Sequence, residues 1–353
     1  MNFGIICEFN PFHKGHQYLI DSVKRDGDGV ICVMSGNFVQ RGEAAVYSKF
    51  ERAETAVKNG ADLVIELVTP CATLSAQGFA EAGVKLLEST GVCDAIAFGA
   101  ECDDVAELKK LAEEIKEKDA DIQKALAEGI SYPAARQKII GSPLLDAPNN
   151  ILAIEYLSCT HLAPVAVKRI GKGHDTDDGE YSASEIRKHI ADKASLQNCE
   201  RAILYQLRTM SAEDFLRIDD VSEGLHNRIY EAVRTAKTLD ELYDTIKTKR
   251  YTHARIRRII LRAYLGITKD TDKTPRYLRV LAMNGKGREL LASIKKSGNL
   301  PVITRYKDAK DIGGEVLAQF ERECRYTDIW GLCCQTPLPC GTDETQKLII
   351  SKE

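Results

Sequence analysis

Two histidines near the N-terminus stand in a pattern suited to phosphate chemistry. His13 and His16 flank Gly15, follow a short apolar run over residues 3–7, and precede a helical pattern. Ligands of open parallel sheets bind beyond the carboxyl ends of the strands, where a helix N-terminus presents free N–H groups. Attack on an α-phosphorus adds negative charge to phosphate oxygens, which two imidazole donors can stabilise. We therefore predict that His13 and His16 are catalytic residues of a nucleotide site; the alternative is two unrelated histidines in a proline-containing loop.

A second candidate phosphate contact comes much later in the chain. Ser182, Ser184 and Arg187 stand at the start of a helical pattern that follows an expected strand over residues 165–170. Hydroxyl groups at a helix start and an arginine one turn later can bind a phosphate together. Read alone, the same residues form an ordinary helix cap with an exposed arginine. Their position across the sheet from the histidine motif favours phosphate binding.

The densest basic run of the sequence lies between residues 247 and 262. Its candidate RNA contacts are Lys249, Arg250, Arg255, Arg258 and Arg262. On a helix starting near Thr252, positions 255, 258 and 262 share one face and could follow a phosphate backbone. Tyrosines interleaved with the run could stack on unpaired bases. The alternative is a solvated helix face that pairs with acidic neighbours such as Asp240.

These side chains need a sheet to position them, and the alternation of patterns predicts one. Short apolar runs predict strands over residues 3–7, 30–34, 62–67, 95–99 and 165–170, separated by helical patterns. Such repetition is typical of an α/β fold with a Rossmann-like, doubly wound parallel sheet. Helical periodicity then takes over at 202–210, 212–217, 225–235 and 239–246. We expect an α/β domain over residues 1–192 and a mainly α-helical C-terminal domain over residues 193–353.

Composition sets broad limits on the class of protein. The chain has 353 residues, 44% of them hydrophobic and 29% charged, which excludes a disordered or fibrous protein and allows two domains. The net charge of -3 gives no global signature of nucleic-acid binding, so any RNA surface must be local. The first apolar run is too short for a signal sequence or a membrane span. We expect a cytoplasmic protein with no membrane association.

The eleven cysteines are scattered along the chain, and without a secretory signal this predicts reduced thiols. The one cluster consists of Cys324, Cys333, Cys334 and Cys340. Its spacing lacks paired C-x-x-C motifs and no histidine lies nearby, so we expect no metal site formed by protein side chains.

Seven runs between Cys7 and Lys188 carry a resemblance to a known family. They are CEFNPFHKGH from Cys7, MSGNFVQRGEAAVYSK from Met34, GADLVIEL from Gly60, AFGAE from Ala97, PNNILAIEYL from Pro148, KRIGKGHD from Lys168 and SASEIRK from Ser182. Together they resemble the bacterial tRNA(Met) cytidine acetate ligase family, within the nucleotidyltransferase superfamily that shares the His-x-Gly-His motif. The resemblance covers the first domain densely and the second only loosely.

The resemblance implies a nucleotidyltransferase-type fold and a ligase that uses ATP, with Mg²⁺, to convert acetate into acetyl-adenylate and pyrophosphate. The acetyl group would then pass to N4 of the wobble cytidine of elongator tRNA(Met), with release of AMP. No obligate protein partner is implied. The acceptor nucleotide, the tRNA and the choice of acetate rest on the resemblance alone.

The same resemblance implies which residues hold ATP. These are Ile6, Cys7, Glu8, Phe9, Asn10, Pro11, Phe12, His13, Lys14, Gly15, His16, Gln17, Tyr18 and Leu19 in the first run, and Gly99, Asn149 and Arg169 in later ones. The last three could instead be a strand end, a helix cap and a surface cation. After the second expected strand, Gln40 and Arg41 are candidate contacts for acetate or phosphate, although loop polarity explains them nearly as well.

Two other functions remain compatible with these motifs. An adenylyltransferase acting on a phosphorylated cofactor precursor would use both phosphate motifs but would need no basic helical domain. A nonenzymatic, ATP-sensing RNA-binding protein would keep the fold without turnover. The basic run favours a tRNA substrate over the first alternative, and the intact histidine motif disfavours the second.

Overall fold

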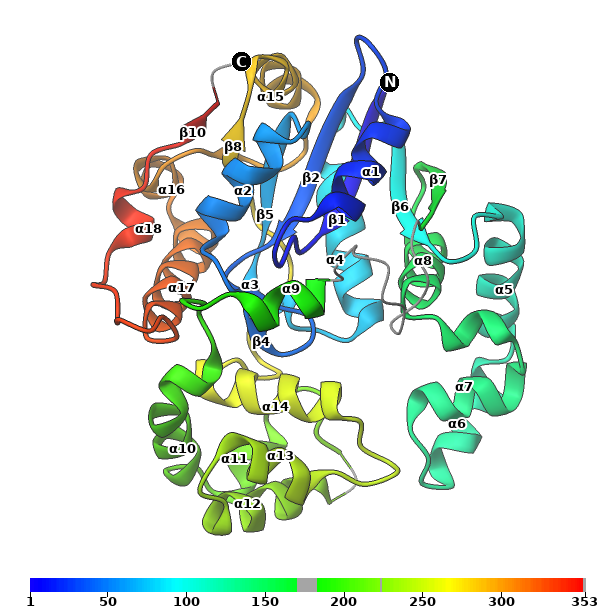
Figure 1. The fold of residues 1–353 in the computed structure, drawn as a ribbon, viewed down its shortest axis with the longest axis vertical. Coiled ribbons are helices and arrows are strands. Elements are labelled where there is room, and N and C mark those ends of the chain that lie inside the picture. The colour runs from blue at the N-terminus through cyan, green and yellow to red at the C-terminus, as the bar shows by residue number, and fades with distance from the viewer. Residues whose placement is uncertain (170–182, 223, 352–353) are drawn as a thin grey trace.

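The computed structural model describes residues 1–169, 183–222 and 224–351, and a mixed sheet with helices on both faces lies at its centre (Figure 1). The strand order is β10-β8-β5-β2-β1-β6-β7, and β9 also pairs with β8. The five parallel strands are β1 (Asn2–Cys7), β2 (Gly29–Ser35), β5 (Leu63–Leu67), β6 (Ala95–Ala100) and β7 (Ala163–Lys168). They correspond to the five expected strands, and the expected α/β fold is confirmed.

Alternate residues of each central strand enter two different cores. In β2, Ile31 and Val33 pack toward helices α4 and α8, whereas Val30 and Cys32 pack toward α1 and α2. Burial on both faces explains why these strands read as continuous apolar runs. The helices of this part are α1 (Lys14–Val23), α2 (Lys49–Lys58), α3 (Thr69–Ala72), α4 (Ala76–Ser89), α5 (Val105–Glu117), α6 (Asp119–Ala127), α7 (Tyr132–Ile140), the 3₁₀ turn η1 (Pro143–Asp146), α8 (Pro148–Cys159) and α9 (Ala183–His189). A short hairpin of β3 (Phe38–Val39) and β4 (Glu43–Ala44) follows β2.

A helical unit follows α9, and its apolar core also includes Phe38 and Ala44 of the β3–β4 hairpin and Trp330 of α17 (Gly314–Gly331). It comprises η2 (Leu196–Cys199), α10 (Glu200–Arg208), α11 (Ala212–Leu216), α12 (Leu225–Thr235), α13 (Leu239–Ile246) and α14 (His253–Leu265). In Figure 1 it lies below the carboxyl edge of the sheet, on the same side of the sheet as α6 and α7. These helices agree with the expected helical periodicity.

The chain then returns to the sheet, which the sequence analysis did not anticipate. Strand β8 (Leu278–Met283) pairs antiparallel with β5, and β9 (Val302–Ile303) and β10 (Ile349–Ile350) pair parallel with β8. The sheet is therefore mixed rather than purely parallel. Helices α15 (Gly285–Ser297), α16 (Tyr306–Ile312), α17 (Gly314–Gly331) and α18 (Thr342–Thr345) complete the chain. The division at residue 192 stays a prediction, but it assigns these sheet strands to the helical half.

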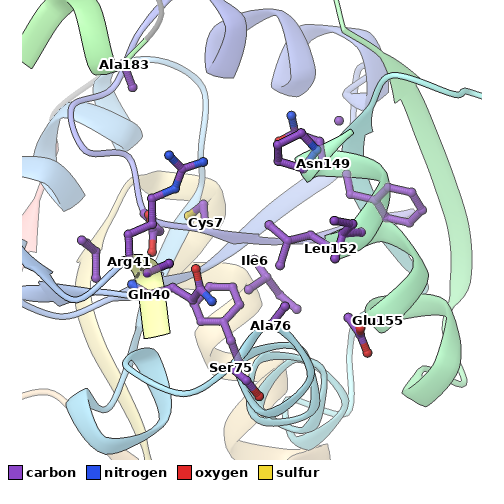
Figure 2. A pocket seen from close by; sticks show the side chains of 18 of the residues that line it. Ile6, Cys7, Gln40, Arg41, Ser75, Ala76, Asn149, Leu152, Glu155 and Ala183 are labelled. Carbon is purple, nitrogen blue, oxygen red and sulfur yellow. Dashed lines mark hydrogen bonds between the residues drawn. The ribbon is translucent and has the colours of Figure 1, made fainter. Parts of the chain in front are cut away.

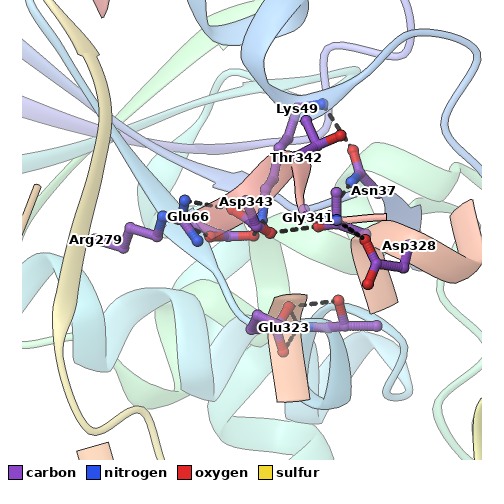
Figure 3. Close-up of polar contacts among 12 residues, drawn as sticks. Asn37, Lys49, Glu66, Arg279, Glu323, Asp328, Gly341, Thr342 and Asp343 are labelled. Carbon is purple, nitrogen blue, oxygen red and sulfur yellow. Dashed lines mark hydrogen bonds and ion pairs between the residues drawn. The ribbon is translucent and has the colours of Figure 1, made fainter. Parts of the chain in front are cut away.

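A buried ionic network ties this returning segment to the first part of the chain (Figure 3). Lys49 Nζ lies 2.6 Å from Glu66 Oε1 and 2.7 Å from Asp343 Oδ2, and Arg279 forms ion pairs with both carboxylates. All four side chains are buried. Burial alone would raise the pKa of Asp343, but Arg279 and Lys49 lower it to about 2. The charges of α2, β5, β8 and α18 thus neutralise one another inside the protein.

Replacing one carboxylate of this network should destabilise the fold strongly. We expect Asp343→Asn to lower the free energy of unfolding by about 3 kcal/mol or more, because Lys49 and Arg279 lose a buried counter-charge. The measurement is urea denaturation at pH 7, with Glu113→Gln on the exposed face of α5 as the matched control. A loss no larger than that of the control would contradict the structural role of the network.

Candidate active site

The two histidines of the first motif form the N-terminal cap of α1. His13 is the N-cap residue and its Nδ1 accepts a hydrogen bond from the Gly15 backbone N–H at 3.0 Å. The His13 N–H in turn donates to Nδ1 of His16 at 3.3 Å. The two rings stack with their centroids 3.7 Å apart. Because each Nδ1 accepts a backbone proton, each neutral ring carries its own proton on Nε2.

The electrostatic surroundings keep both rings neutral. Burial, helped by the positive charges of Arg169 and Arg187, lowers the pKa of His13 to about 4. Burial, with His13 and Arg169, lowers the pKa of His16 well below its usual value. The hydrogen bonds lead to the same conclusion, since a protonated Nδ1 could not accept a backbone N–H. At pH 7 the motif therefore presents two uncharged Nε2–H donors.

The position of the His13 ring over the start of α1 leaves no room for a side chain at Gly15. A Cβ atom at position 15 would lie 2.9 Å from Cε1 of His13 and 3.1 Å from its Nδ1. Any larger residue would push the ring from its place, which explains the glycine between the two histidines. His16 is held from its other side by Phe9 and Phe12, whose ring centroids lie 4.9 and 5.6 Å from its own.

The second motif lies against the first, whereas the sequence analysis expected it across the sheet; its binding of phosphate stays a prediction. Arg187 Nη1 donates to the backbone oxygen of Asn10 at 2.7 Å, and its Nη2 donates to Ser184 Oγ at 3.1 Å. Asn10 Oδ1 accepts from the N–H of Val46, which fixes the loop before α1. Ser182 lies outside the described residues. The structure thus places one arginine and one hydroxyl of the second motif beside the loop that carries the histidines.

The opposite side of the histidine pair is formed by the ends of β6 and β7 and the start of α8. Asn149 Nδ2 donates to Glu101 Oε1 at 2.6 Å, and Arg169 Nε lies 3.9 Å from the same oxygen. Gly99 faces Arg169, whose Cγ lies 3.5 Å from the place of a Cβ on that glycine. Glu101 was not among the predicted site residues. The sequence feature that could have indicated it is its position directly after β6, where ligands of such sheets bind.

Most of these groups line one large cleft at the carboxyl edge of the sheet, with a volume of about 1850 Å³. Figure 2 shows Gln40 and Arg41 on one side of it and Asn149 and Leu152 on the other. Lining residues from the predicted ATP set are Ile6, Cys7, Glu8, Phe9, Asn10, His13, Lys14, Gly15, His16, Tyr18, Leu19, Gly99, Asn149, Arg169, Ser184 and Arg187. Pro11, Phe12 and Gln17 do not line the cleft in the described part of the chain.

The loop that carries Gln40 is anchored to the strand-end residue Glu8. The N–H of Gln40 donates to Glu8 Oε1 at 2.7 Å, and burial raises the pKa of this carboxyl. Buried Arg52 donates to the backbone oxygens of Glu8 and Ser35, which joins the ends of the first two strands. The loop is therefore fixed relative to the histidine pair, while the Arg41 side chain stays exposed.

The basic run on α14 is not the single RNA-facing stripe that the sequence suggested. Arg262 is 0% exposed, pairs with Asp219 at 2.6 Å, and donates to the backbone oxygen of Pro70 at 2.9 Å. Arg258 is also buried and pairs with Asp220 at 3.1 Å. The exposed-face prediction is wrong for these two residues, because α14 packs against the α/β part as well as against its own helical core.

The other basic candidates remain accessible. Arg250 and Arg255 line the cleft, and Lys249 is exposed. Arg255 donates to the backbone oxygen of Asp220 at 2.7 Å and to Ser222 Oγ at 3.0 Å, so its guanidinium is held at the cleft wall. Their contact with RNA stays a prediction.

The described residues contain no group of three or more His, Cys, Asp or Glu side chains that could hold a metal ion. All eleven cysteines are free thiols, and Cys199 Sγ lies 3.3 Å from Cys333 Sγ. No helix in the described ranges is both long enough and apolar enough to cross a bilayer.

Comparison with known proteins gives consistent matches along the whole chain. A family model described as HIGH Nucleotidyl Transferase matches residues 1–203 and 193–344. The tRNA(Met) cytidine acetate ligase of Acetivibrio thermocellus is 35% identical and covers 98% of this chain and 99% of its own; that of a Thermoanaerobacter species is 39% identical and covers 98% of both. A crystal structure of Thermotoga maritima TmcAL bound with alpha-thio ATP is 29% identical, with a TM-score of 0.88 over 100% of both chains.

The protonation state of the histidine pair can be tested without any ligand. In proton and nitrogen NMR spectra of the seven histidines, we expect the Nε2–H tautomer for both rings and a titration midpoint of about 4 for His13. His13→Gln and His16→Gln assign the signals, and urea-unfolded protein provides the ordinary midpoint near ~6.5. A folded-state midpoint at this ordinary value would contradict the proposed hydrogen-bond arrangement.

Proposed function

The chain belongs to the tRNA(Met) cytidine acetate ligase family, and from this premise we propose that it activates acetate with ATP and acetylates N4 of the wobble cytidine of elongator tRNA(Met). The observation that supports this most is the pair of neutral Nε2–H donors of His13 and His16, set at a helix N-terminus beside Arg169 and Arg187. This arrangement offers hydrogen bonds and positive charge to a phosphate but no protein nucleophile.

In the first step, an oxygen of acetate attacks the α-phosphorus of ATP, the bond to the bridging oxygen breaks, and pyrophosphate leaves. His13 and His16 donate to the phosphate oxygens on which negative charge grows, and the start of α1 adds backbone amides. Arg169 and Arg187 neutralise further phosphate charge. Gln40 and Arg41, on the facing loop, are suited to hold the small carboxylate.

In the second step, N4 of cytosine attacks the acetyl carbonyl, the bond between the carbonyl carbon and the phosphate-bound oxygen breaks, and AMP leaves. The N4 proton goes to solvent or to the departing phosphate. The exocyclic amine is a poor nucleophile, so the reaction needs a mixed anhydride. The same imidazole donors stabilise the phosphate of AMP as it departs.

Mg²⁺ supplies charge neutralisation on the phosphates when it is bound. Such an ion commonly enters with the nucleotide, held by phosphates, waters and one or two carboxylates. Glu8 and Glu101 border the cleft and fit that limited requirement. The protein's own part is to orient the nucleotide through the histidines and arginines.

The tRNA would enter the cleft, whose lining includes residues of α7 and of the helical unit. Lys249 is exposed, and Arg250 and Arg255 line the cleft there, so they can contact phosphates of a bound RNA. We assign no RNA contact to Arg258 or Arg262. An elongator tRNA substrate supports a cytoplasmic location for this reaction.

Loss of one imidazole donor tests this function directly. We expect His16→Ala to slow acetate-dependent exchange of pyrophosphate into ATP, and N4-acetylcytidine formation on elongator tRNA(Met), by roughly 100- to 1,000-fold, as for a lost oxyanion donor. His161→Ala, an exposed histidine outside the cleft, is the control. Unchanged rates in His16→Ala would refute the site assignment. Exchange driven by a phosphorylated cofactor precursor but not by acetate would support the adenylyltransferase alternative.

A further inference from the structure

The cleft is larger than the proposed ATP site requires. A pocket for one small ligand typically occupies roughly 300 to 1,000 Å³, whereas this cleft measures about 1850 Å³. Its additional space lies between α4, α7 and α8, and we refer to this space as the α7 arm. Its apolar lining consists of Phe79, Leu126, Ile130, Leu145, Ile151 and Leu152. None of these residues belongs to the set assigned to ATP.

An exposed aromatic ring stands in the wall of the α7 arm. Tyr132, at the start of α7, is 38% exposed although it lines the cleft. The guanidinium of Arg136 lies 5.4 Å from the centroid of its ring. Arg136 in turn donates to Glu155 of α8 at 2.8 Å. The ring is thus linked through Arg136 to Glu155 of α8.

The polar part of this chain is buried and incompletely satisfied. Arg136 is 4% exposed, and its Nε has no hydrogen-bond partner among the described residues. Glu155 also lines the cleft, and burial raises the pKa of its carboxyl despite the nearby Arg136. Figure 2 shows Glu155 on the same helix as Leu152 and Asn149, farther from the start of that helix. A donor and an acceptor therefore line the same cleft as the aromatic ring of Tyr132.

Such a combination suits an unpaired nucleobase. Bases taken out of a stack are bound between aromatic and apolar side chains, and their edges are read by hydrogen bonds. The donor N4 and the acceptor N3 of cytosine are adjacent, which matches a carboxylate beside a guanidinium. Tyr132 and Leu152 supply the aromatic and aliphatic surfaces of the α7 arm.

The α7 arm also borders the surface proposed for RNA. The turn between α6 and α7 contains Gly129, and a Cβ there would lie 3.8 Å from Nη1 of Arg250. An RNA strand whose phosphates contact Lys249 and Arg255 would therefore pass beside the α7 arm.

We propose that the α7 arm binds the unpaired acceptor cytosine, with Tyr132 as its stacking platform and Arg136 and Glu155 as groups that position it. This inference rests on the proposed function, because it assumes an RNA acceptor. It goes further by assigning the acceptor a site made by α7 and α8.

The experiment compares acetylation of elongator tRNA(Met) by Tyr132→Ala, Tyr132→Phe and Tyr205→Ala. Because Tyr132→Ala loses one stacking contact, its kcat/KM for the tRNA should fall by roughly 10- to 100-fold. Its acetate-dependent pyrophosphate exchange should change at least ~10-fold less than this kcat/KM. Tyr132→Phe keeps the ring and should restore most of the activity. Tyr205, 71% exposed on α10 and outside the cleft, is the matched control and should behave as the unmodified protein.

A second readout does not depend on turnover. An anticodon stem-loop with fluorescent pyrrolocytosine at the acceptor position should be quenched on binding to the unmodified protein and to Tyr132→Phe, but not to Tyr132→Ala. If the unmodified protein acetylates the tRNA while Tyr132→Ala matches Tyr205→Ala in rate and quenching, the base site is refuted and the proposed function stands. If the unmodified protein does not acetylate the tRNA at all, the proposed function fails and this inference fails with it.

Discussion

The chemistry of this protein depends on two hydrogen bonds at the start of one helix, from the backbone N–H groups of Gly15 and His13 to the Nδ1 atoms of His13 and His16. Each bond fixes the tautomer of a ring, and burial beside Arg169 and Arg187 keeps both rings uncharged. The result is a pair of Nε2–H donors that need no reorganisation when a phosphate arrives. Without the backbone bonds, either nitrogen of each ring could carry the proton.

The rest of the fold fixes the position of the histidine pair relative to the loop that carries Gln40 and Arg41. Strand β1 delivers the histidines to the carboxyl edge of the sheet, while segments far along the chain secure the loop with Gln40 and Arg41. Trp330 Nε1 donates to the backbone oxygen of Ala45 at 2.9 Å, and Asn37 Nδ2 donates to Thr327 Oγ1 at 3.2 Å. The C-terminal helices therefore act on the active site through backbone anchoring, and the buried ionic network of Lys49 and its partners attaches those helices to the sheet.

Elements and motifs that depend on neighbouring residues could be predicted from the sequence. Features that depend on burial by a distant segment could not. The five parallel strands and the position of the histidine motif at a helix start were readable because apolar runs and short motifs act over a few residues. Strand β8 was missed because Arg279 interrupts its apolar run LRVLAM, and the partner strand β5 and the buried carboxylates that pair with Arg279 come from distant segments. Arg262 was wrongly predicted to be exposed. Helical periodicity separates the apolar face of α14 from its basic face, but it cannot show that other segments cover both faces. Glu101 was missed because an acidic residue after a strand has no distinctive pattern until α8 lies against it.

The central claim is that an acetate oxygen bonds to the α-phosphorus at the histidine pair and that the acetyl group then moves to cytosine. Mass spectrometry of both products formed from ATP, elongator tRNA(Met) and acetate labelled with oxygen-18 on both oxygens tests it most directly. The account predicts that one labelled oxygen appears in AMP and the other in N4-acetylcytidine. Acetylated tRNA with unlabelled AMP would contradict it, because the acetyl group would then have been activated without an adenylate.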